Sequence, residues 1–196
     1  MNSKRQYIGK DEYSFTKNNP YEIVTDKKII QKQKELIDRV HDLGKEVVIS
    51  THPYIPMNGN QIEDLVCFLA ERNPDKNYIG IDIKGARMWR GAKTATERGM
   101  ENVGFVRTRI EFIRSFFAEG EVDEIWITFP DPQLKSRRAK KRLTSPLFLA
   151  DYKKMLSEDG VINLKTDSKH LYAYTAAVIE RLGLNVEVQN DDIYGS

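Results

Sequence analysis

The sequence predicts an α/β domain in which helices cover a doubly wound, mostly parallel sheet. Short apolar runs alternate with helical segments of roughly 10–15 residues, and this order is typical of parallel strands. Two of the runs finish near a carboxylate, Asp82 and Asp131, and open parallel sheets bind ligands at the carboxyl ends of their strands. The chain has 196 residues, of which 40% are hydrophobic and 31% charged, which suits one domain with a substantial core.

The chain is expected to begin with an arm that precedes the domain. Residues 1–26 are polar, with scattered aromatic side chains and no clear period. We therefore expect an irregular N-terminal arm, followed by a domain over residues 27–196. The first helix of that domain can be capped by Asp26 and ended by Gly44.

Short apolar runs predict the strands. The run before Asp131 is stopped abruptly by Pro130 and Pro132, which cannot donate to a strand ladder. The expected strands are Glu46–Ser50, Tyr78–Ile83, Val103–Arg107, Glu124–Phe129, Val161–Lys165 and Asn185–Val188.

Apolar residues spaced three and four apart predict the helices. Pro146 suits a first helical turn, because an N–H at that position has no helical partner. The Asn73-Pro74 pair marks the end of an earlier helix. The expected helices after Gly44 cover about Ile62–Leu69, Gly85–Arg98, Ile110–Phe117, Ser145–Leu156 and Lys169–Leu182.

Composition narrows the environment of the protein. The single cysteine, Cys67, has no partner for an internal disulfide and suits a reducing cytoplasm. No apolar run approaches the ~20 residues of a membrane span, and the N-terminus does not resemble a signal peptide. We therefore expect a cytoplasmic protein with no membrane segment and no metal site. The net charge of +2 is small, so positive charge matters here through its clustering.

The most informative stretch is Trp126–Pro146. Its two prolines leave Asp131 in a stiff turn at the end of a buried strand. Directly afterwards, Leu134–Arg142 carries six cations in nine residues. These cations are interpreted either as a solvated charge run or as a surface for an anionic polymer beside the carboxylate.

Four motifs in this half of the chain resemble the tRNA (guanine-N7-)-methyltransferase family. They are Phe129-Pro130-Asp131-Pro132, the Lys135–Arg142 cluster, Arg142-Leu143-Thr144-Ser145-Pro146 and Leu164-Lys165-Thr166-Asp167. The resemblance covers about residues 69–196. It implies a Rossmann-like, class I methyltransferase fold, S-adenosylmethionine as cofactor and tRNA as partner, in a monomer or homodimer.

The resemblance also implies roles for particular residues. Asp131 is the expected catalytic residue, which holds the guanine base and lies beside the cofactor. Lys135 and Asp167 match substrate contacts of the family, although Asp167 is equally suited to cap the helix that follows it. Positive side chains that would meet phosphates supply affinity and salt dependence without reading sequence. These are Arg137, Arg138, Lys140, Lys141 and Arg142, and basic residues of the arm are further candidates.

The cofactor residues follow from strand ends. Asp82 ends the second strand of the domain, where an acid normally accepts hydrogen bonds from the ribose hydroxyls. The family has a polar contact to the cofactor after the third strand, and Thr108 and Arg109 align with it.

Two departures from the family pattern leave other functions open. Residues 50–60 contain one glycine and two prolines where the family has a glycine-rich turn, so we expect weak binding of S-adenosylmethionine. A histidine in this loop, His52, weakly resembles that of type I 3-dehydroquinate dehydratases. The family's C-terminal Thr-x-x-Glu substrate motif is not found. A cofactor-free RNA-binding module and a lyase-like hybrid therefore remain alternatives.

Overall fold

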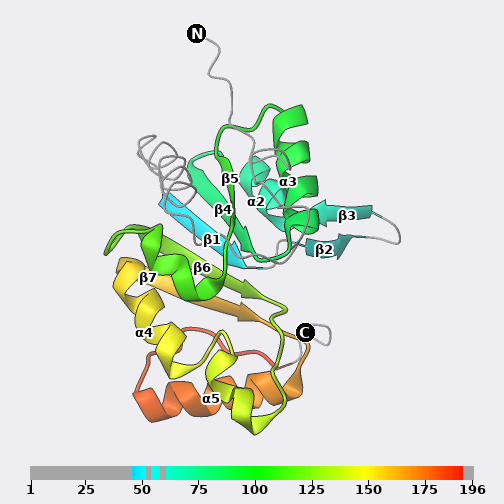
Figure 1. The fold of residues 1–196 in the computed structure, drawn as a ribbon. Coiled ribbons are helices and arrows are strands. Elements are labelled where there is room, and N and C mark those ends of the chain that lie inside the picture. The colour runs from blue at the N-terminus through cyan, green and yellow to red at the C-terminus, as the bar shows by residue number, and fades with distance from the viewer. Residues whose placement is uncertain (1–45, 52–53, 58–60, 192–196) are drawn as a thin grey trace.

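The computed structural model describes residues 46–51, 54–57 and 61–191 (Figure 1). The expected N-terminal arm, the helix ending at Gly44 and His52 lie outside these ranges.

A five-stranded parallel sheet forms the centre of the molecule, in the order β5-β4-β1-β6-β7 (Figure 1). This confirms the predicted α/β fold with a parallel sheet. The strands are β1 (Glu46–Thr51), β4 (Lys76–Asp82), β5 (Val103–Arg107), β6 (Val122–Thr128) and β7 (Leu156–Lys165). Each overlaps a predicted strand, and β5 has the predicted bounds.

Helices connect the strands, and their ends follow local sequence. Ser168 caps the last helix by accepting a hydrogen bond from Leu171 N at 3.2 Å, and Gly183 ends it in the left-handed conformation at φ 61°. The helices are α2 (Leu65–Arg72), α3 (Gly85–Glu97), α4 (Pro146–Met155) and α5 (Lys169–Leu182), with 3₁₀ helices η1 (Ile110–Ser115) and η2 (Ser136–Lys141).

Two predicted elements are wrong. The helix expected from Ile62 begins only at Leu65, because β2 (Tyr54–Met57) and β3 (Gln61–Asp64) form an antiparallel hairpin before it. The Asn58-Gly59 pair between them is a strong hairpin signal in the sequence.

The strand expected at residues 185–188 is irregular and fully at the surface, with Val188 86% exposed. An apolar alternation becomes a strand only when a neighbouring strand pairs with it.

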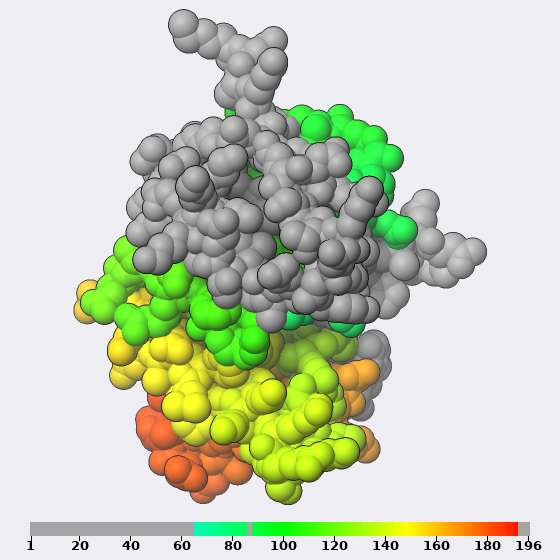
Figure 2. Space-filling view, in the orientation of Figure 1, coloured from blue at the N-terminus to red at the C-terminus, as the bar shows by residue number. Residues whose placement is uncertain are grey.

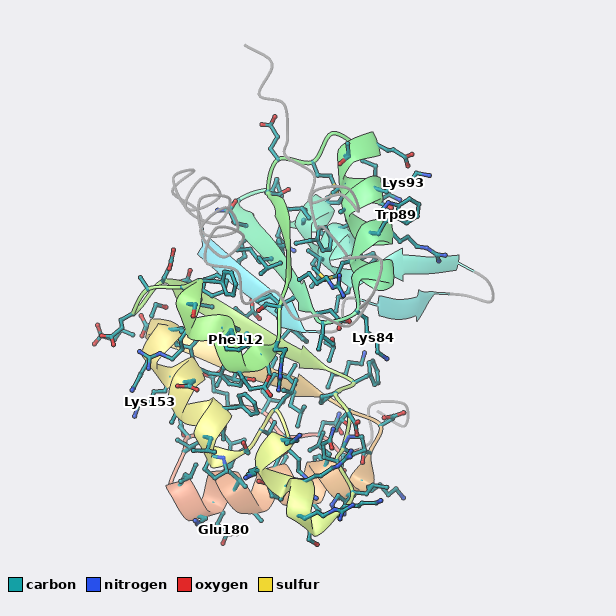
Figure 3. The ribbon with its side chains drawn as sticks, viewed as in Figure 1. Lys84, Trp89, Lys93, Phe112, Lys153 and Glu180 are labelled. Carbon is teal, nitrogen blue, oxygen red and sulfur yellow. The ribbon has the colours of Figure 1, made fainter. Side chains whose placement is uncertain are left out.

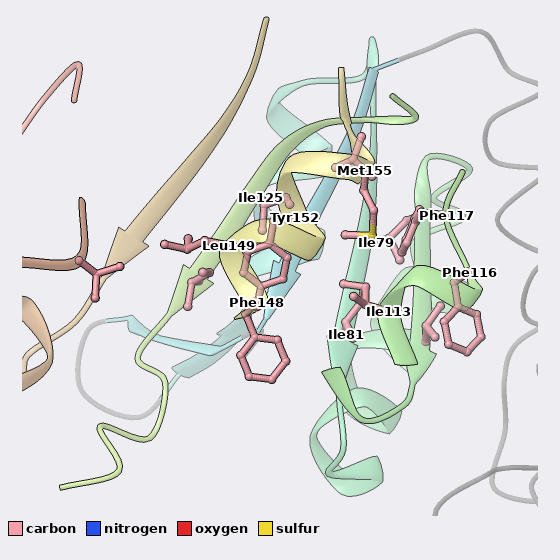
Figure 4. Packing of buried hydrophobic residues seen from close by; sticks show 14 residues of the cluster. Ile79, Ile81, Ile113, Phe116, Phe117, Ile125, Phe148, Leu149, Tyr152 and Met155 are labelled. Atoms are coloured by element: carbon pink, nitrogen blue, oxygen red, sulfur yellow. The ribbon is translucent and has the colours of Figure 1, made fainter. Parts of the chain in front are cut away.

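The sheet buries a different set of side chains on each face. Because side chains alternate along a strand, Ile125 and Ile127 face one cluster, whereas Trp126 packs against the other. The first cluster joins the sheet to η1, α4 and α5 (Figure 4), and the second joins it to α2 and α3. On the outer side of α3, Lys93 Nζ lies 5.5 Å from the ring centroid of the exposed Trp89 (Figure 3).

The order of the strands fixes where a ligand can bind. β1 pairs with β4 on one side and with β6 on the other. The strands that follow β1 in the chain are therefore added first on its β4 side and then on its β6 side, so the strand order switches at β1. All strand ends carrying a predicted site residue lie at the same edge, because the sheet is parallel. A crevice forms at such a switch, outside the carboxyl ends of the strands.

Candidate active site

The Asp131 turn lies at the carboxyl end of β6 and is held by its own backbone. Phe129 N donates to Lys165 O at 2.7 Å, which ties the turn to the end of β7. The exposed Asp131 carboxylate accepts a hydrogen bond from Gln133 N at 2.9 Å through Oδ1. Phe129 and Gln133 both have φ of 45°, a conformation that residues other than glycine rarely adopt. The carboxylate is therefore presented to solvent from a constrained loop.

Arg142 holds the backbone of this turn through hydrogen bonds. Its guanidinium donates from Nε to Pro132 O at 3.0 Å and from Nη2 to Gln133 O at 3.1 Å. It also contacts two side chains of α5: Nη2 lies 2.8 Å from His170 Nε2, and Cζ lies 4.2 Å from the ring centroid of Tyr174. Arg142 is only 4% exposed, so the predicted phosphate contact would require the guanidinium to leave these partners, and that contact stays a prediction.

The other predicted RNA contacts are accessible. Lys135 precedes η2, and Arg137, Arg138, Lys140 and Lys141 lie on it, all exposed. Residues 131–141 form part of the yellow-green surface low in the molecule (Figure 2). Five of the six predicted cations are thus exposed in the segment that directly follows the Asp131 turn.

Asp167 follows β7 and is exposed. It is not the cap of α5, because Ser168 has that role. Since Thr128 of β6 is paired with Lys165 of β7, the Asp131 and Asp167 loops start from neighbouring positions. The helix-cap interpretation of Asp167 is thus removed, and its predicted substrate contact stays a prediction.

Asp82 ends β4 on the other side of β1. Its Oδ1 accepts from Lys84 N at 2.9 Å, and Lys84 lies at the start of α3 (Figure 3). Its Oδ2 is buried and has no hydrogen-bond partner. A buried carboxylate oxygen without a donor is costly, and ribose hydroxyls are donors of the kind it lacks. The residue fits the cofactor role predicted for it.

The loop after Asp82 is also braced by an arginine, Arg107, which the sequence did not suggest. Its Nε donates to Ile83 O at 3.1 Å. The pattern of an aspartate at a strand end, with an arginine holding the next loop, therefore occurs on both sides of β1. Arg107 lies 24 residues after Ile83, so the sequence carries no local signal for its contact, whereas Arg142 lies within the basic cluster that directly follows the Asp131 turn.

Thr108 and Arg109 follow β5, as predicted, but their side chains are engaged with the protein. The Thr108 hydroxyl donates to Arg109 O at 3.3 Å, and Arg109 pairs with Glu111, with Nη2 to Oε1 at 2.8 Å. The hydrogen bond from Arg109 lowers the pKa of Glu111, and the same bond raises the pKa of Arg109. A contact of Arg109 with the cofactor would have to compete with this ion pair, and it stays a prediction.

An apolar hollow lies between α2 and the end of β6. Its volume is about 190 Å³, and two aromatic side chains from β6 and its loop line it. The lining residues are Leu65, Phe68, Leu69, Trp126, Thr128, Phe129 and Lys165. The hollow thus reaches Phe129, two residues before Asp131.

Neither a metal site nor a membrane span is found in the parts of the chain that the structure describes. No group of three or more histidine, cysteine, aspartate or glutamate side chains there could hold a metal ion. None of the helices there has both the length and the apolar character needed to cross a bilayer.

Comparison with known proteins decides the family. A family model described as "Putative methyltransferase" matches residues 62–194. A tRNA (guanine-N(7)-)-methyltransferase from Christiangramia forsetii is 46% identical over 184 residues, covering 92% of this chain and 80% of the relative. The chain belongs to this methyltransferase family.

Other relatives of the family match a smaller part. The tRNA (guanine-N(7)-)-methyltransferase from Porphyromonas gingivalis is 54% identical over 144 residues, with 74% of this chain and 58% of the relative covered. The chain thus spans between about three fifths and four fifths of these two methyltransferases. Because the first match covers 92% of the chain, it includes most of the N-terminal third, where the sequence motifs alone showed little resemblance.

Solved methyltransferases share the fold. A SAM-dependent methyltransferase from Aquifex aeolicus is 16% identical, with 81% of this chain and 90% of that chain covered and a TM-score of 0.51. A 30S ribosomal A1408 methyltransferase from an uncultured bacterium is 15% identical, with 83% and 70% covered and a TM-score of 0.50. The predicted class I methyltransferase fold is confirmed, and the family membership does not favour the alternatives based on His52 or on a cofactor-free RNA-binding module.

Proposed function

We propose that this protein transfers a methyl group from S-adenosylmethionine to N7 of a guanosine in tRNA. One observation carries the proposal: β4 and β6, the two strands that flank β1, each lead to an aspartate at the same edge of the sheet. Asp82 has a buried carboxylate oxygen without a hydrogen-bond donor, and Asp131 is exposed on a constrained turn. The family membership supports the same reaction.

The chemistry asks for positioning more than for a strong base. N7 of guanine has an in-plane lone pair and no proton, so it can attack a methyl group directly when the two are in line. S-adenosylmethionine, when bound, supplies that methyl group on a positively charged sulfur. Asp82 Oδ2 would accept a hydrogen bond from a ribose hydroxyl and so satisfy its own buried acceptor.

Asp131 is the residue proposed to hold the base. Its carboxylate would accept hydrogen bonds from the guanine ring N–H and the exocyclic amine, which orients N7. Oδ1 already accepts from Gln133 N, and each carboxylate oxygen has two lone pairs, so the group has capacity for both donors. The aromatic-walled hollow next to the turn is suited to a flat, partly apolar group.

RNA affinity would come from the exposed cations next to Asp131. Lys135 and the four cations of η2 are exposed, and none of them belongs to an ion pair between the described residues. Lys141 is near enough to Glu111 to help lower the pKa of that carboxyl. Phosphate contacts of this kind position an RNA and leave recognition of the base to the site itself.

Methylation of tRNA transcripts by the purified chain tests the proposal. After incubation with S-adenosylmethionine, nuclease digestion and mass spectrometry should find 7-methylguanosine. A transcript made with 7-deazaguanosine, which has a C–H in place of N7, should accept no methyl group. Methyl transfer to the deaza transcript, or to another atom of the normal one, would contradict the proposal. Retained tRNA binding with no cofactor binding would select the RNA-binding module.

A further inference from the structure

We propose that Arg142 is a positioning residue that fixes the Asp131 carboxylate for reaction, although its place in the basic cluster suggests an RNA contact. This inference rests on the proposed function. It assigns to the last cation of the cluster a role different from that of its neighbours. Two sets of contacts connect α5, the guanidinium and the Asp131 turn.

The first set anchors the guanidinium on α5. An arginine side chain has only N–H donors, so in the 2.8 Å contact between Arg142 Nη2 and His170 Nε2 the histidine must accept. His170 therefore carries its ring proton on Nδ1 when this bond forms. Tyr174, one turn later on α5, presents its ring to the same guanidinium at 4.2 Å. The charge is thus held between two side chains of a 14-residue helix.

The second set connects the guanidinium to the turn. Arg142 donates to the carbonyl oxygens of Pro132 and Gln133, at 3.0 and 3.1 Å. Gln133 in turn donates its N–H to Asp131 Oδ1 at 2.9 Å. Each step from α5 to the carboxylate is therefore a hydrogen bond or ring contact, and Gln133 is the residue through which Arg142 acts on Asp131.

The turn needs such a brace. Gln133 and Phe129 both have φ of 45°. Residues with a Cβ atom disfavour this conformation, so contacts from the surrounding structure must hold it in place. A planar guanidinium can satisfy two carbonyls and a ring nitrogen at fixed angles, whereas a lysine ammonium is a point charge on a flexible stem. The geometry is therefore specific to arginine.

A neighbouring contact provides the matched control. The hydroxyls of Thr144 and Thr175 lie 2.7 Å apart and are buried. They join the segment after Arg142 to α5 without touching the Asp131 turn. Thr175→Val should therefore weaken the same interface between segments while leaving the Arg142 contacts to Pro132 and Gln133 in place.

The experiment compares Arg142→Lys, Arg142→Ala and Thr175→Val in the full chain by steady-state methylation of tRNA. For both Arg142 variants we expect kcat to fall by ~10²-fold, the loss typical of a misplacement of about 1 Å. KM for tRNA and the Kd for S-adenosylmethionine should stay within about threefold. Thr175→Val should lower the Tm and leave kcat within about threefold, because it does not alter the turn.

The outcomes separate this inference from the proposed function. If the wild-type chain does not methylate tRNA, the proposed function fails; if it does and Arg142→Lys keeps its rate, this inference fails. A loss of tRNA affinity without loss of kcat would instead make Arg142 a phosphate contact. Should the Arg142 variants not fold, His170→Ala decides: a reduced kcat with unchanged tRNA affinity supports the positioning role, and an unchanged kcat overturns it.

Discussion

The strands on the two sides of β1 present a carboxylate at the same edge of the sheet by different means. Asp82 and Asp131 both accept the N–H of the residue two positions later, each at 2.9 Å, and an arginine holds the next loop in both cases. On the β4 side the second carboxylate oxygen is buried and has no partner. On the β6 side the carboxylate is exposed, and the backbone around it is constrained.

The difference matches the two ligands proposed for these sides. A small cofactor can enter a closed site. A buried acceptor there lacks a hydrogen bond only while the site is empty, and a ligand hydroxyl removes this cost when it binds. A base that is part of a large RNA must be met near the surface. There, burial cannot hold the carboxylate, so a rigid turn and a buried arginine do so instead. Substitutions on the two sides should therefore change different kinetic constants.

The largest effect is expected on the β6 side. Asp131→Asn keeps the shape of the side chain but removes its charge and one acceptor. Methyl transfer should fall by ~10²-fold or more, with tRNA affinity nearly unchanged, because the interaction that is removed orients the reacting base. Single-turnover rates together with filter binding of tRNA measure the two quantities. An equally active variant would show that Asp131 does not hold the base.

A smaller effect is expected on the β4 side. Asp82→Asn should weaken S-adenosylmethionine binding by ~10- to 100-fold, since one hydrogen bond to a charged group contributes ~1.5–3 kcal/mol. Calorimetric titration of both proteins measures it, and the wild-type titration also tests the weak binding predicted from residues 50–60. Unchanged affinity in Asp82→Asn would mean that the open oxygen does not meet the cofactor.

The basic cluster should affect binding in a salt-dependent way. Replacing Arg137, Arg138, Lys140 and Lys141 with alanine should weaken tRNA binding. The slope of log affinity against log salt should become shallower by up to ~0.9 for each phosphate that is no longer neutralised. Replacement of Lys153 and Lys154 on α4 is the control, because it removes exposed charge elsewhere (Figure 3). A slope equal to that of the wild type in the four-residue variant would place the RNA on another surface.

The smallest effect concerns the ion pair after β5. Arg109 holds the pKa of Glu111 below its usual value. The ion pair therefore stabilises the fold at pH values above the pKa of glutamate in the unfolded chain, near 4.3. This stabilisation is lost as the pH falls through the lower pKa that Glu111 has in the folded protein. Because Glu111 is 45% exposed, Glu111→Gln should cost at most ~1 kcal/mol at pH 7 and nothing near pH 2. Urea unfolding at both pH values checks this, with Glu158→Gln, at an exposed glutamate outside the described ion pairs, as control.

Sequence patterns predicted most of the sheet and the helices because periodic burial is a local property. α5 and β5 have the predicted bounds, since a clear cap or a compact apolar run marks each of them. The hairpin before α2 was missed because the apolar spacing around Ile62 also fits a helix. The strand expected at residues 185–188 was wrong because a strand needs a neighbouring strand to pair with, and the local sequence does not show whether one is present.

The candidate site was predictable where single residues carry it and not where distant segments meet. Asp82, Asp131 and the exposed cations follow from strand ends and charge, and the structure places them at one edge or next to it. Arg142 has the same sequence signature as its exposed neighbours. What distinguishes it is contact with His170 and Tyr174 on α5, about 30 residues later, which composition and spacing do not reveal.

The central position of β1 also has a consequence for how the chain folds. Val48 pairs with Tyr78 of β4, 30 positions later (78 − 48), but with Glu124 of β6, 76 positions later (124 − 48). The pairing with β4 closes a short loop, whereas the pairing with β6 closes a long one and costs more chain entropy. The half of the sheet around Asp82 can therefore form while the chain is still being synthesised, and the half that presents Asp131 joins it only after β6 has emerged.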